Sequence, residues 1–210
     1  MDILCFSYGL AYANMYVLRF GNEAIVIDPC CPWDETGFSD VSVKAVLCTH
    51  GHFDHISEAE DILARFSCPL YISEYDRNML PDPELNHSSS FGLHVSVNAP
   101  SASFPKESMS SADLGLHTEN EFILQVVPTP GHTSGSVCFL FVFKDDHREV
   151  MFTGDTLFRR GIGRTDLGGS EEEMRRSIDL LRTMNDDIEC YPGHGSKTDL
   201  RSEKRLNPFF

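Results

Sequence analysis

Short apolar runs separated by polar turns recur along the chain and predict a protein rich in β-strands. The runs are rich in Val, Ile, Leu and Phe, and Gly, Pro, Asn or Asp bound most of them, as is typical of buried strands. The strands predicted in this way cover residues 3–6, 15–20, 24–28, 44–48, 70–72, 122–127, 137–143, 150–153 and 188–191. Polar turns at residues 19–23 and 144–148 predict two β-hairpins.

A helical spacing of apolar residues predicts two helices, over residues 58–66 and 171–184. Ser170 precedes the second helix and Glu173 follows three positions later, which is the capping-box pattern that marks a helix start. The apolar residues of this helix recur on one face, so we interpret it as a helix that packs against a core.

The order of these elements predicts an α/β fold. Each half of the chain runs from strands to a polar loop and then to a helix or a further strand. This order indicates a sandwich of two sheets covered by outer helices, built as one domain over residues 1–210. We expect the loops at the strand ends to meet at one edge of the sandwich.

Residues 81–120 depart from this pattern, because they are rich in Ser, Pro and Asn and lack a clear period. A long segment of this kind in a compact domain is more often functional or mobile than accidental. We interpret it as a flap or lid over the strand-end loops, and the alternative is a surface excursion that never contacts a substrate.

Composition and charge narrow the classes of partner. The chain of 210 residues carries 32 acidic and 17 basic side chains, for a net charge of -15. A nucleic-acid partner is disfavoured because polyanion binding needs basic patches. No basic leader opens the chain and no apolar run reaches membrane-spanning length, so we expect a cytoplasmic protein without a membrane partner. The sequence leaves the oligomeric state open.

The seven cysteines are an odd number and form no CxxC pair. A disulfide framework or a zinc ribbon is therefore disfavoured, and we interpret the cysteines as buried free thiols.

The candidate chemistry lies in four glycine-containing loops, each of which follows a predicted strand. These loops are Thr49-His50-Gly51-His52-Phe53-Asp54-His55, Pro130-Gly131-His132-Thr133, Thr153-Gly154-Asp155-Thr156 and Pro192-Gly193-His194-Gly195. Together they supply five histidines and two aspartates. The remaining histidines lie in other loops, and we interpret them as solvated surface residues: His87, His94, His117 and His147.

Clustered imidazoles and carboxylates are typical of a metal site, because divalent cations attract both groups. Neutral imidazole and carboxylate suit zinc, iron and manganese. The spacing from His50 to His55 is too tight for the paired histidines of a helical zinc-protease motif. It indicates a loop that leaves a strand and wraps around a pair of ions.

With these loops, the chain resembles the metallo-β-lactamase-fold hydrolases. Among them it is most similar to the small stand-alone form of the type II glyoxalase (hydroxyacylglutathione hydrolase) branch. The resemblance extends from Ala13-Asn14-Met15-Tyr16 and Val26-Ile27-Asp28-Pro29 to Asn207-Pro208-Phe209, and includes the stretch from Gly154 to Asp166. It implies an αββα four-layer sandwich with two metal ions at one edge.

The resemblance also implies roles for individual residues. One metal ion would be held by His50, His52 and His132, the other by Asp54, His55 and His194, with Asp155 between them. The metals would be two divalent ions, zinc first, with iron or manganese as alternatives. A bridging hydroxide, oriented by Asp54 as the catalytic residue, would attack a small acyl thioester of the S-D-lactoylglutathione type. Arg164 would bind the substrate's carboxylate, and its alternative role is a structural ion pair with Asp166.

Other functions of the same fold remain as alternatives. True β-lactamases commonly carry Cys at the position of Asp155, which disfavours antibiotic hydrolysis here. Only 16 residues follow His194, so we expect the glutathione-binding helical domain of full-length type II glyoxalases to be absent. A mononuclear-iron persulfide dioxygenase is the first alternative, although such enzymes usually carry Cys at the position of Ile162. The second is a hydrolase of other esters, lactones or phosphodiesters.

Overall fold

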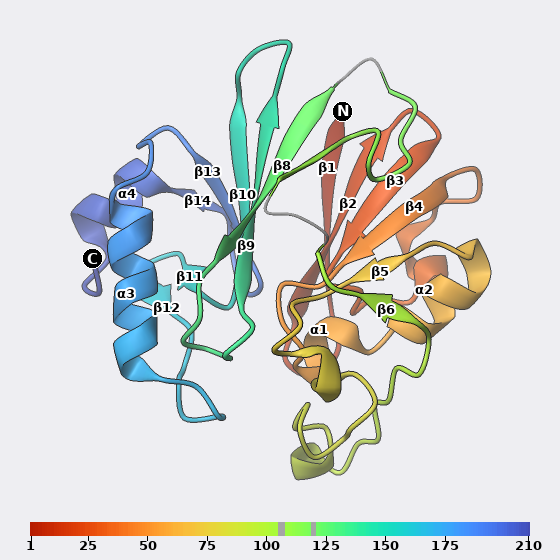
Figure 1. Cartoon of the computed structure of the whole chain (residues 1–210), viewed down its shortest axis with the longest axis horizontal. Coiled ribbons are helices and arrows are strands. Elements are labelled where there is room, and N and C mark those ends of the chain that lie inside the picture. Colours follow the sequence, from red (N-terminus) through yellow and green to blue (C-terminus); the bar gives the residue numbers. More distant parts are fainter. Residues whose placement is uncertain (105–107, 119–120) are drawn as a thin grey trace.

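The computed structural model describes residues 1–104, 108–118 and 121–210, and its strands form two large sheets (Figure 1). In the first sheet the spatial order follows the chain, and β1, β2 and β3 are antiparallel neighbours while β3 to β6 run parallel. Its strands are β1 (Asp2–Tyr8), β2 (Ala13–Phe20), β3 (Glu23–Ile27), β4 (Ser42–Leu47), β5 (Leu70–Tyr71) and β6 (Ser101–Ala102).

The second sheet has the order β14-β13-β10-β9-β8-β7 and is antiparallel except between β10 and β13. A separate two-stranded hairpin joins β11 (Leu157–Phe158) to β12 (Gly161–Ile162). The strands of the second sheet are β7 (Ser108–Ser110), β8 (Phe122–Pro128), β9 (Val137–Phe143), β10 (Glu149–Gly154), β13 (Glu189–Pro192) and β14 (Thr198–Asp199).

The helices cover the outer faces of the two sheets. In Figure 1, α3 and α4 lie beyond the second sheet and α2 lies beyond the first. Ser170 caps α3 as the sequence predicts, because its hydroxyl accepts a hydrogen bond from the Glu173 amide at 3.3 Å. The helices are α1 (Phe53–Ile56), α2 (Ala59–Phe66), α3 (Glu171–Arg182) and α4 (Leu200–Leu206), with short 3₁₀ turns at Trp33–Thr36, Arg77–Met79 and Ser89–Phe91.

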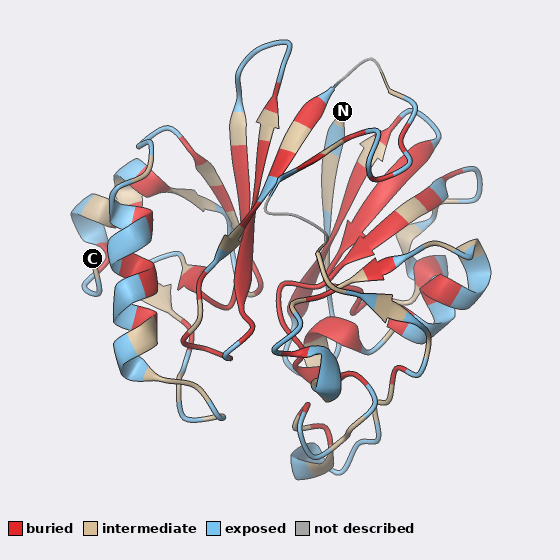
Figure 2. Cartoon of the chain, in the orientation of Figure 1, coloured by how far each residue is buried: buried red, intermediate tan, exposed pale blue. Residues whose placement is uncertain are grey.

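The buried apolar side chains of the described residues form three hydrophobic cores, one between the sheets and one under the helices on each outer side. A strand contributes to two of them because its successive side chains point to opposite faces. In β2, Met15 and Val17 pack toward α2, whereas Tyr16 and Leu18 pack between the sheets. In the second sheet the outward side chains, such as Leu140, pack against α3 and α4. Figure 2 shows the central strands of both sheets mostly buried, the edge strand β1 without buried residues, and α3 buried on one face. The predicted αββα four-layer sandwich is confirmed.

All nine predicted strands and both predicted helices occur, and the hairpin turns join β2 to β3 and β9 to β10. The helix predicted over 171–184 ends at Arg182, two residues early. The elements that sequence patterns did not predict are short, with α1, α4, β6, β7 and β14 among them.

The segment 81–120 is divided between several parts of the fold. Its first part folds back beside α1, where the Phe53 amide donates to the Asn86 carbonyl at 3.0 Å. Later residues add the edge strands β6 and β7 to the two sheets. Residues 105–107 and 119–120, which belong to this segment, lie outside the described residues. A lid-like motion of the segment stays a prediction, as does the single-domain organisation.

All seven cysteines are free. Five of them are buried, as predicted, but Cys5 is exposed on the edge strand β1 and Cys68 is partly exposed, so the prediction of buried thiols is wrong for Cys5. Across the three described ranges, no helix is long and apolar enough to span a lipid bilayer.

Candidate metal centre

The loop after β4 delivers the first group of polar side chains to the edge where the two sheets face each other (Figure 1). The strand ends at Leu47, the chain turns through Gly51, and α1 begins at Phe53. A side chain at Gly51 would lie 2.7 Å from the Met79 side chain, so only glycine fits this turn without displacing a neighbour. The loop packs closely against its neighbours, and His50, His52 and His55 are all buried.

Three loops of the second sheet face this one. His132 follows β8, Asp155 follows β10 and His194 follows β13. The amide of Gly193 donates to the carbonyl of Gly154 at 2.8 Å, which ties the last two loops together. The cluster thus lies at the edge shared by both sheets, as the sequence predicts.

The seven predicted ligand residues form three overlapping groups whose candidate ligand atoms lie within 4.8 Å of one another. The groups are His50, His52 and His132; His50, His55 and Asp155; and Asp54, His55 and His194. Asp155 connects the two ends of the cluster. One carboxylate oxygen lies 3.5 Å from Nε2 of His132 and 3.4 Å from Nε2 of His194, and the other lies 3.4 Å from Nε2 of His55.

Three buried polar atoms of this cluster lack a hydrogen-bond partner within the described part of the chain: His50 Nε2, His52 Nε2 and Asp155 Oδ1. An unsatisfied buried polar atom is costly, and native structures rarely keep one without a reason. Imidazole nitrogens and a carboxylate oxygen are the donor atoms of zinc and iron sites, so the donor set fits divalent metal ions. Whether each residue binds metal stays a prediction.

Three of the clustered imidazoles are oriented through the ring nitrogen Nδ1. Nδ1 of His55 lies 2.9 Å from the buried Asp28 carboxylate, and Nδ1 of His132 lies 2.7 Å from the Arg164 carbonyl. Nδ1 of His194 lies 3.1 Å from the Ala11 carbonyl. Such partners fix the tautomer and aim the free nitrogen at a metal.

Sequence reasoning missed the role of Asp28. It is the last residue of the strand predicted over residues 24–28, and a single aspartate there has no distinctive pattern. Its carboxylate also accepts hydrogen bonds from the amide and the hydroxyl of Thr49, each at 2.7 Å. Asp28 therefore fixes both the start of the histidine loop and the ring of His55.

Burial sets the charge of the imidazoles at one end of the cluster. It lowers the pKa of His50 well below its usual value, and neighbouring His55 adds to the effect. Burial, together with the nearby His132, lowers the pKa of His52 to about 3. Both rings are neutral at pH 7 and hold lone pairs ready for a cation.

Carboxylates dominate at the other end of the cluster. Burial alone would lower the pKa of His55, but Asp155, Asp54 and Asp28 outweigh it and raise the pKa well above the usual value. Burial alone would also lower the pKa of His194. Hydrogen bonds with Asp155 and Asp54 outweigh burial and raise this pKa to about 9. In the metal-free protein these two imidazoles carry the positive charge that balances the aspartates.

A second buried carboxylate, Asp76, connects two of the ligand loops. It accepts hydrogen bonds from the amide of Gly51 at 3.0 Å, the amide of Gly135 at 2.9 Å and the hydroxyl of Thr133 at 2.7 Å. Burial raises the pKa of Asp76, and these three donors oppose that rise. Asp76 holds the loop of the first sheet against the loop that carries His132, and no sequence pattern indicates this role.

A cavity of about 450 Å³ opens over the cluster. Its wall includes His87, whose ring centroid lies 5.2 Å from that of His52. The interpretation of His87 as a solvated surface residue is therefore wrong, because residues 81–98 fold back over the site. The same interpretation holds for His94, His117 and His147, which are exposed.

Arg164 also lines the cavity, but its guanidinium is already paired. Its Nε and one terminal nitrogen each lie 2.6 Å from an oxygen of Asp166. This is the structural ion pair that the sequence left as one of two alternatives, and substrate binding by Arg164 stays a prediction.

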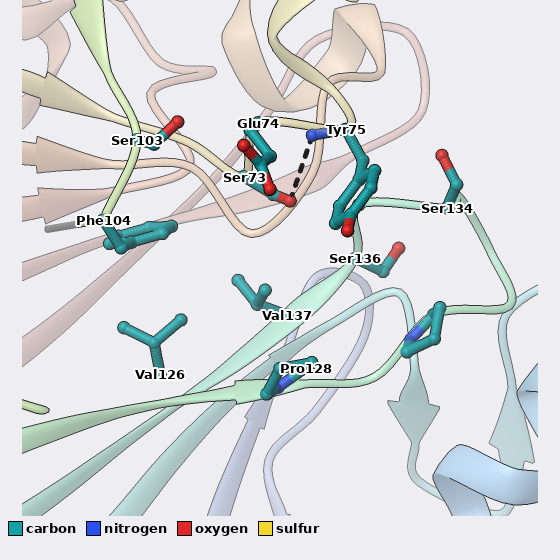
Figure 3. A pocket seen from close by; sticks show the side chains of 12 residues that line it. Ser73, Glu74, Tyr75, Ser103, Phe104, Val126, Pro128, Ser134, Ser136 and Val137 are labelled. Atoms are coloured by element: carbon teal, nitrogen blue, oxygen red, sulfur yellow. Dashed lines mark hydrogen bonds between the residues drawn. The ribbon is translucent and has the colours of Figure 1, made fainter. Parts of the chain in front are cut away.

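A separate cavity of about 420 Å³ contains none of the seven clustered residues. Figure 3 shows Val126, Pro128 and Val137 on one side of it and residues 73–75 on the other. The Asp76 carboxylate accepts a hydrogen bond from the amide of Gly135, which also lines this separate cavity. Of these two cavities, only the first is lined by residues of the cluster.

Comparison with known proteins places the chain in a family. The model of the metallo-beta-lactamase superfamily matches residues 8–194. Hydroxyacylglutathione hydrolase GloC of Haemophilus influenzae is 34% identical over 173 residues, which are 81% of this chain and 77% of that protein.

Two solved structures share the whole fold. The BLEG-1 B3 metallo-beta-lactamase superposes with a TM-score of 0.83 at 31% identity and covers 99% of both chains. TTHA1623 in a di-iron-bound form gives a TM-score of 0.80 at 26% identity, over 99% of this chain and 100% of that one. The family match over most of the chain, joined to a buried His/Asp cluster suited to metal ions, shows that this protein is a metal-dependent hydrolase of the metallo-β-lactamase superfamily.

Proposed function

We propose that the protein hydrolyses acyl thioesters of the S-D-lactoylglutathione type with two divalent metal ions held by the seven-residue cluster. The observation that carries the proposal is the position of Asp155, whose two carboxylate oxygens face the His132 and the His55 ends of the cluster. The likeness to a hydroxyacylglutathione hydrolase supports the choice of substrate.

Metal ions in such a site activate water at neutral pH and polarise a carbonyl group. We assign His50, His52 and His132 to one ion and Asp54, His55 and His194 to the other. Zinc is our first choice for both ions. Iron and manganese suit the same donors, and the similar TTHA1623 structure is a di-iron-bound form.

We assign to Asp54 the role of orienting the attacking water. It is half-buried, lines the open cavity and lies 3.4 Å from Nε2 of His194. Burial alone would raise its pKa, but His55 and His194 outweigh this effect and lower the pKa. Asp54 therefore stays a carboxylate at neutral pH and can accept a proton or hydrogen bond from water. A thiolate leaving group needs little help from a general acid.

The test is an assay of S-D-lactoylglutathione hydrolysis by protein stripped with a chelator and then reloaded with zinc or manganese. We expect chelation to abolish turnover and metal to restore it, in air and under nitrogen alike. Asp155→Ala should lose both metal content and activity. Lys144→Ala, far from the cluster on an exposed turn, should keep both.

Two results would contradict the proposal. Oxygen consumption with glutathione persulfide, without thioester cleavage, would identify a dioxygenase. Hydrolysis of a β-lactam without thioester cleavage would assign the site to a different class of bond.

A further inference from the structure

We propose that the acyl group of the substrate is apolar, and that the enzyme prefers an unbranched chain of several carbons to the hydroxylated D-lactoyl group. This inference rests on the proposed thioester hydrolysis and concerns the wall of the same cavity.

Apolar side chains flank the metal cluster on both sides. Next to His194, the ring of Phe158 lies with its centroid 5.9 Å from that of the imidazole. Next to His52, the ring of Phe53 packs against that of Phe91, with the ring planes tilted by 40° and the centroids 5.2 Å apart. A substrate carbonyl placed over the cluster would therefore have hydrocarbon on either side.

Two large apolar residues stand at the rim with much of their surface exposed. The exposed fraction is 66% for Leu10 and 53% for Phe91, and both line the cavity. A single exposed apolar residue needs no explanation, but two that face the same reactive site indicate a surface to be covered by a ligand. The cavity volume of about 450 Å³ lies within the range of small-molecule sites.

The charges near the cavity do not favour an acidic or strongly polar acyl group. Arg164 is the one permanently cationic side chain among the described residues of the wall. The Arg164 guanidinium donates two hydrogen bonds to the Asp166 carboxylate, which balances its positive charge. Contact with hydrocarbon is the main interaction that the wall offers to the acyl group.

The binding test uses S-alkylglutathiones, which carry a chain on sulfur and cannot be hydrolysed. A fully buried CH₂ group contributes about fourfold in affinity. We expect the zinc-loaded protein to bind S-hexylglutathione at least about tenfold more tightly than S-methylglutathione in calorimetric titrations, since the chain is partly buried.

Matched variants locate the effect. Leu10→Ser and Phe91→Ser should each reduce the hexyl-to-methyl affinity ratio by about threefold or more. The controls Leu206→Ser and Phe209→Ser change residues of the same types with exposed fractions of 60% and 54%, outside this cavity, and should leave the ratio unchanged.

The kinetic counterpart is kcat/KM for S-hexanoylglutathione, which should exceed that for S-D-lactoylglutathione. Equal affinity for the hexyl and methyl ligands, or an equal loss in the control variants, would overturn the inference while leaving thioester hydrolysis intact. Chain-dependent binding without cleavage of any thioester would support the apolar site and overturn the proposed function instead.

Discussion

The carboxylate of Asp28 lies 2.9 Å from Nδ1 of His55, and both side chains are buried. Because the carboxylate can only accept at this contact, it fixes the hydrogen of the imidazole on Nδ1. The other nitrogen, Nε2, then faces Asp155 and His194 with its lone pair available once the ring is neutral. Asp28 is not one of the predicted metal ligands, but it determines which nitrogen of the predicted ligand His55 can bind a metal.

Asp28→Asn should weaken metal binding without unfolding the protein. An amide group can donate to Nδ1, which would move the ring hydrogen to Nε2 and block the metal-facing atom. We expect the affinity for the metal ion assigned to Asp54, His55 and His194 to fall by about 10–100-fold, measured in competition with a chelator. Asp34→Asn, which changes an exposed partner of Arg65, is the control. Unchanged affinity in Asp28→Asn would show that this contact does not orient the ligand.

Asp76→Ala should destabilise the protein more than an ordinary surface change does. It leaves the buried amides of Gly51 and Gly135 without their acceptor, whereas the hydroxyl of Thr133 keeps its contact with the Ser136 hydroxyl. Each buried unsatisfied group costs about 1–3 kcal/mol, so we expect a loss of at least about 2 kcal/mol in the free energy of unfolding by urea. Asp179→Ala, on the exposed face of α3, should cost little. Equal losses would mean that Asp76 does not hold the two loops.

Gly193→Ala should remove metal binding because there is no room for a side chain. A Cβ at this position would lie 2.3 Å from Oδ1 of Asp155 and 2.7 Å from the ring of His55. Gly161→Ala is the matched control, since its nearest neighbour would be 3.9 Å away. We expect metal content measured by mass spectrometry to fall sharply only in Gly193→Ala. Full occupancy in that variant would place the metals elsewhere.

Metal binding should release protons, and its affinity should rise with pH. In the metal-free protein the pKa of His194 is about 9 and that of His55 is raised, so both rings are protonated at pH 7. A metal binds only the neutral ring, whereas His50 and His52 are already neutral. Affinity should therefore increase from pH 6 toward pH 9, by about tenfold per pH unit for each proton released.

Zinc titrations by calorimetry in buffers of different ionisation enthalpy measure this release. We expect at least about one proton per chain at pH 7, and about one fewer in His194→Ala. Affinity that does not change with pH, with no proton released, would contradict the charge state assigned to these two rings.

The sequence predicts the layers of the fold well because their signals are local. Strand alternation and the Ser170 cap act within a few residues, and the structure confirms both. Elements such as α1 and β14 are too short to carry a period of their own. Tertiary contacts decide them.

The difference between local sequence signals and tertiary contacts also explains which residues of the candidate site could be predicted. Glycine-bounded loops after strands revealed the seven clustered residues, because clustered imidazoles are unusual in any sequence. The positions of Asp28, Asp76 and His87 depend on chain segments far apart in sequence, and a lone aspartate or histidine in a loop has no distinctive pattern. Their roles therefore required the three-dimensional structure.

The rate of S-D-lactoylglutathione hydrolysis, measured as metal-free protein receives increasing equivalents of zinc per chain, tests the binuclear hydrolase most directly. We predict that the rate rises to its maximum at two equivalents and that Asp155→Ala gains no activity at any zinc level. A maximum at one equivalent, or no hydrolysis after two have bound, would contradict the claim that this cluster is a two-metal thioester hydrolase.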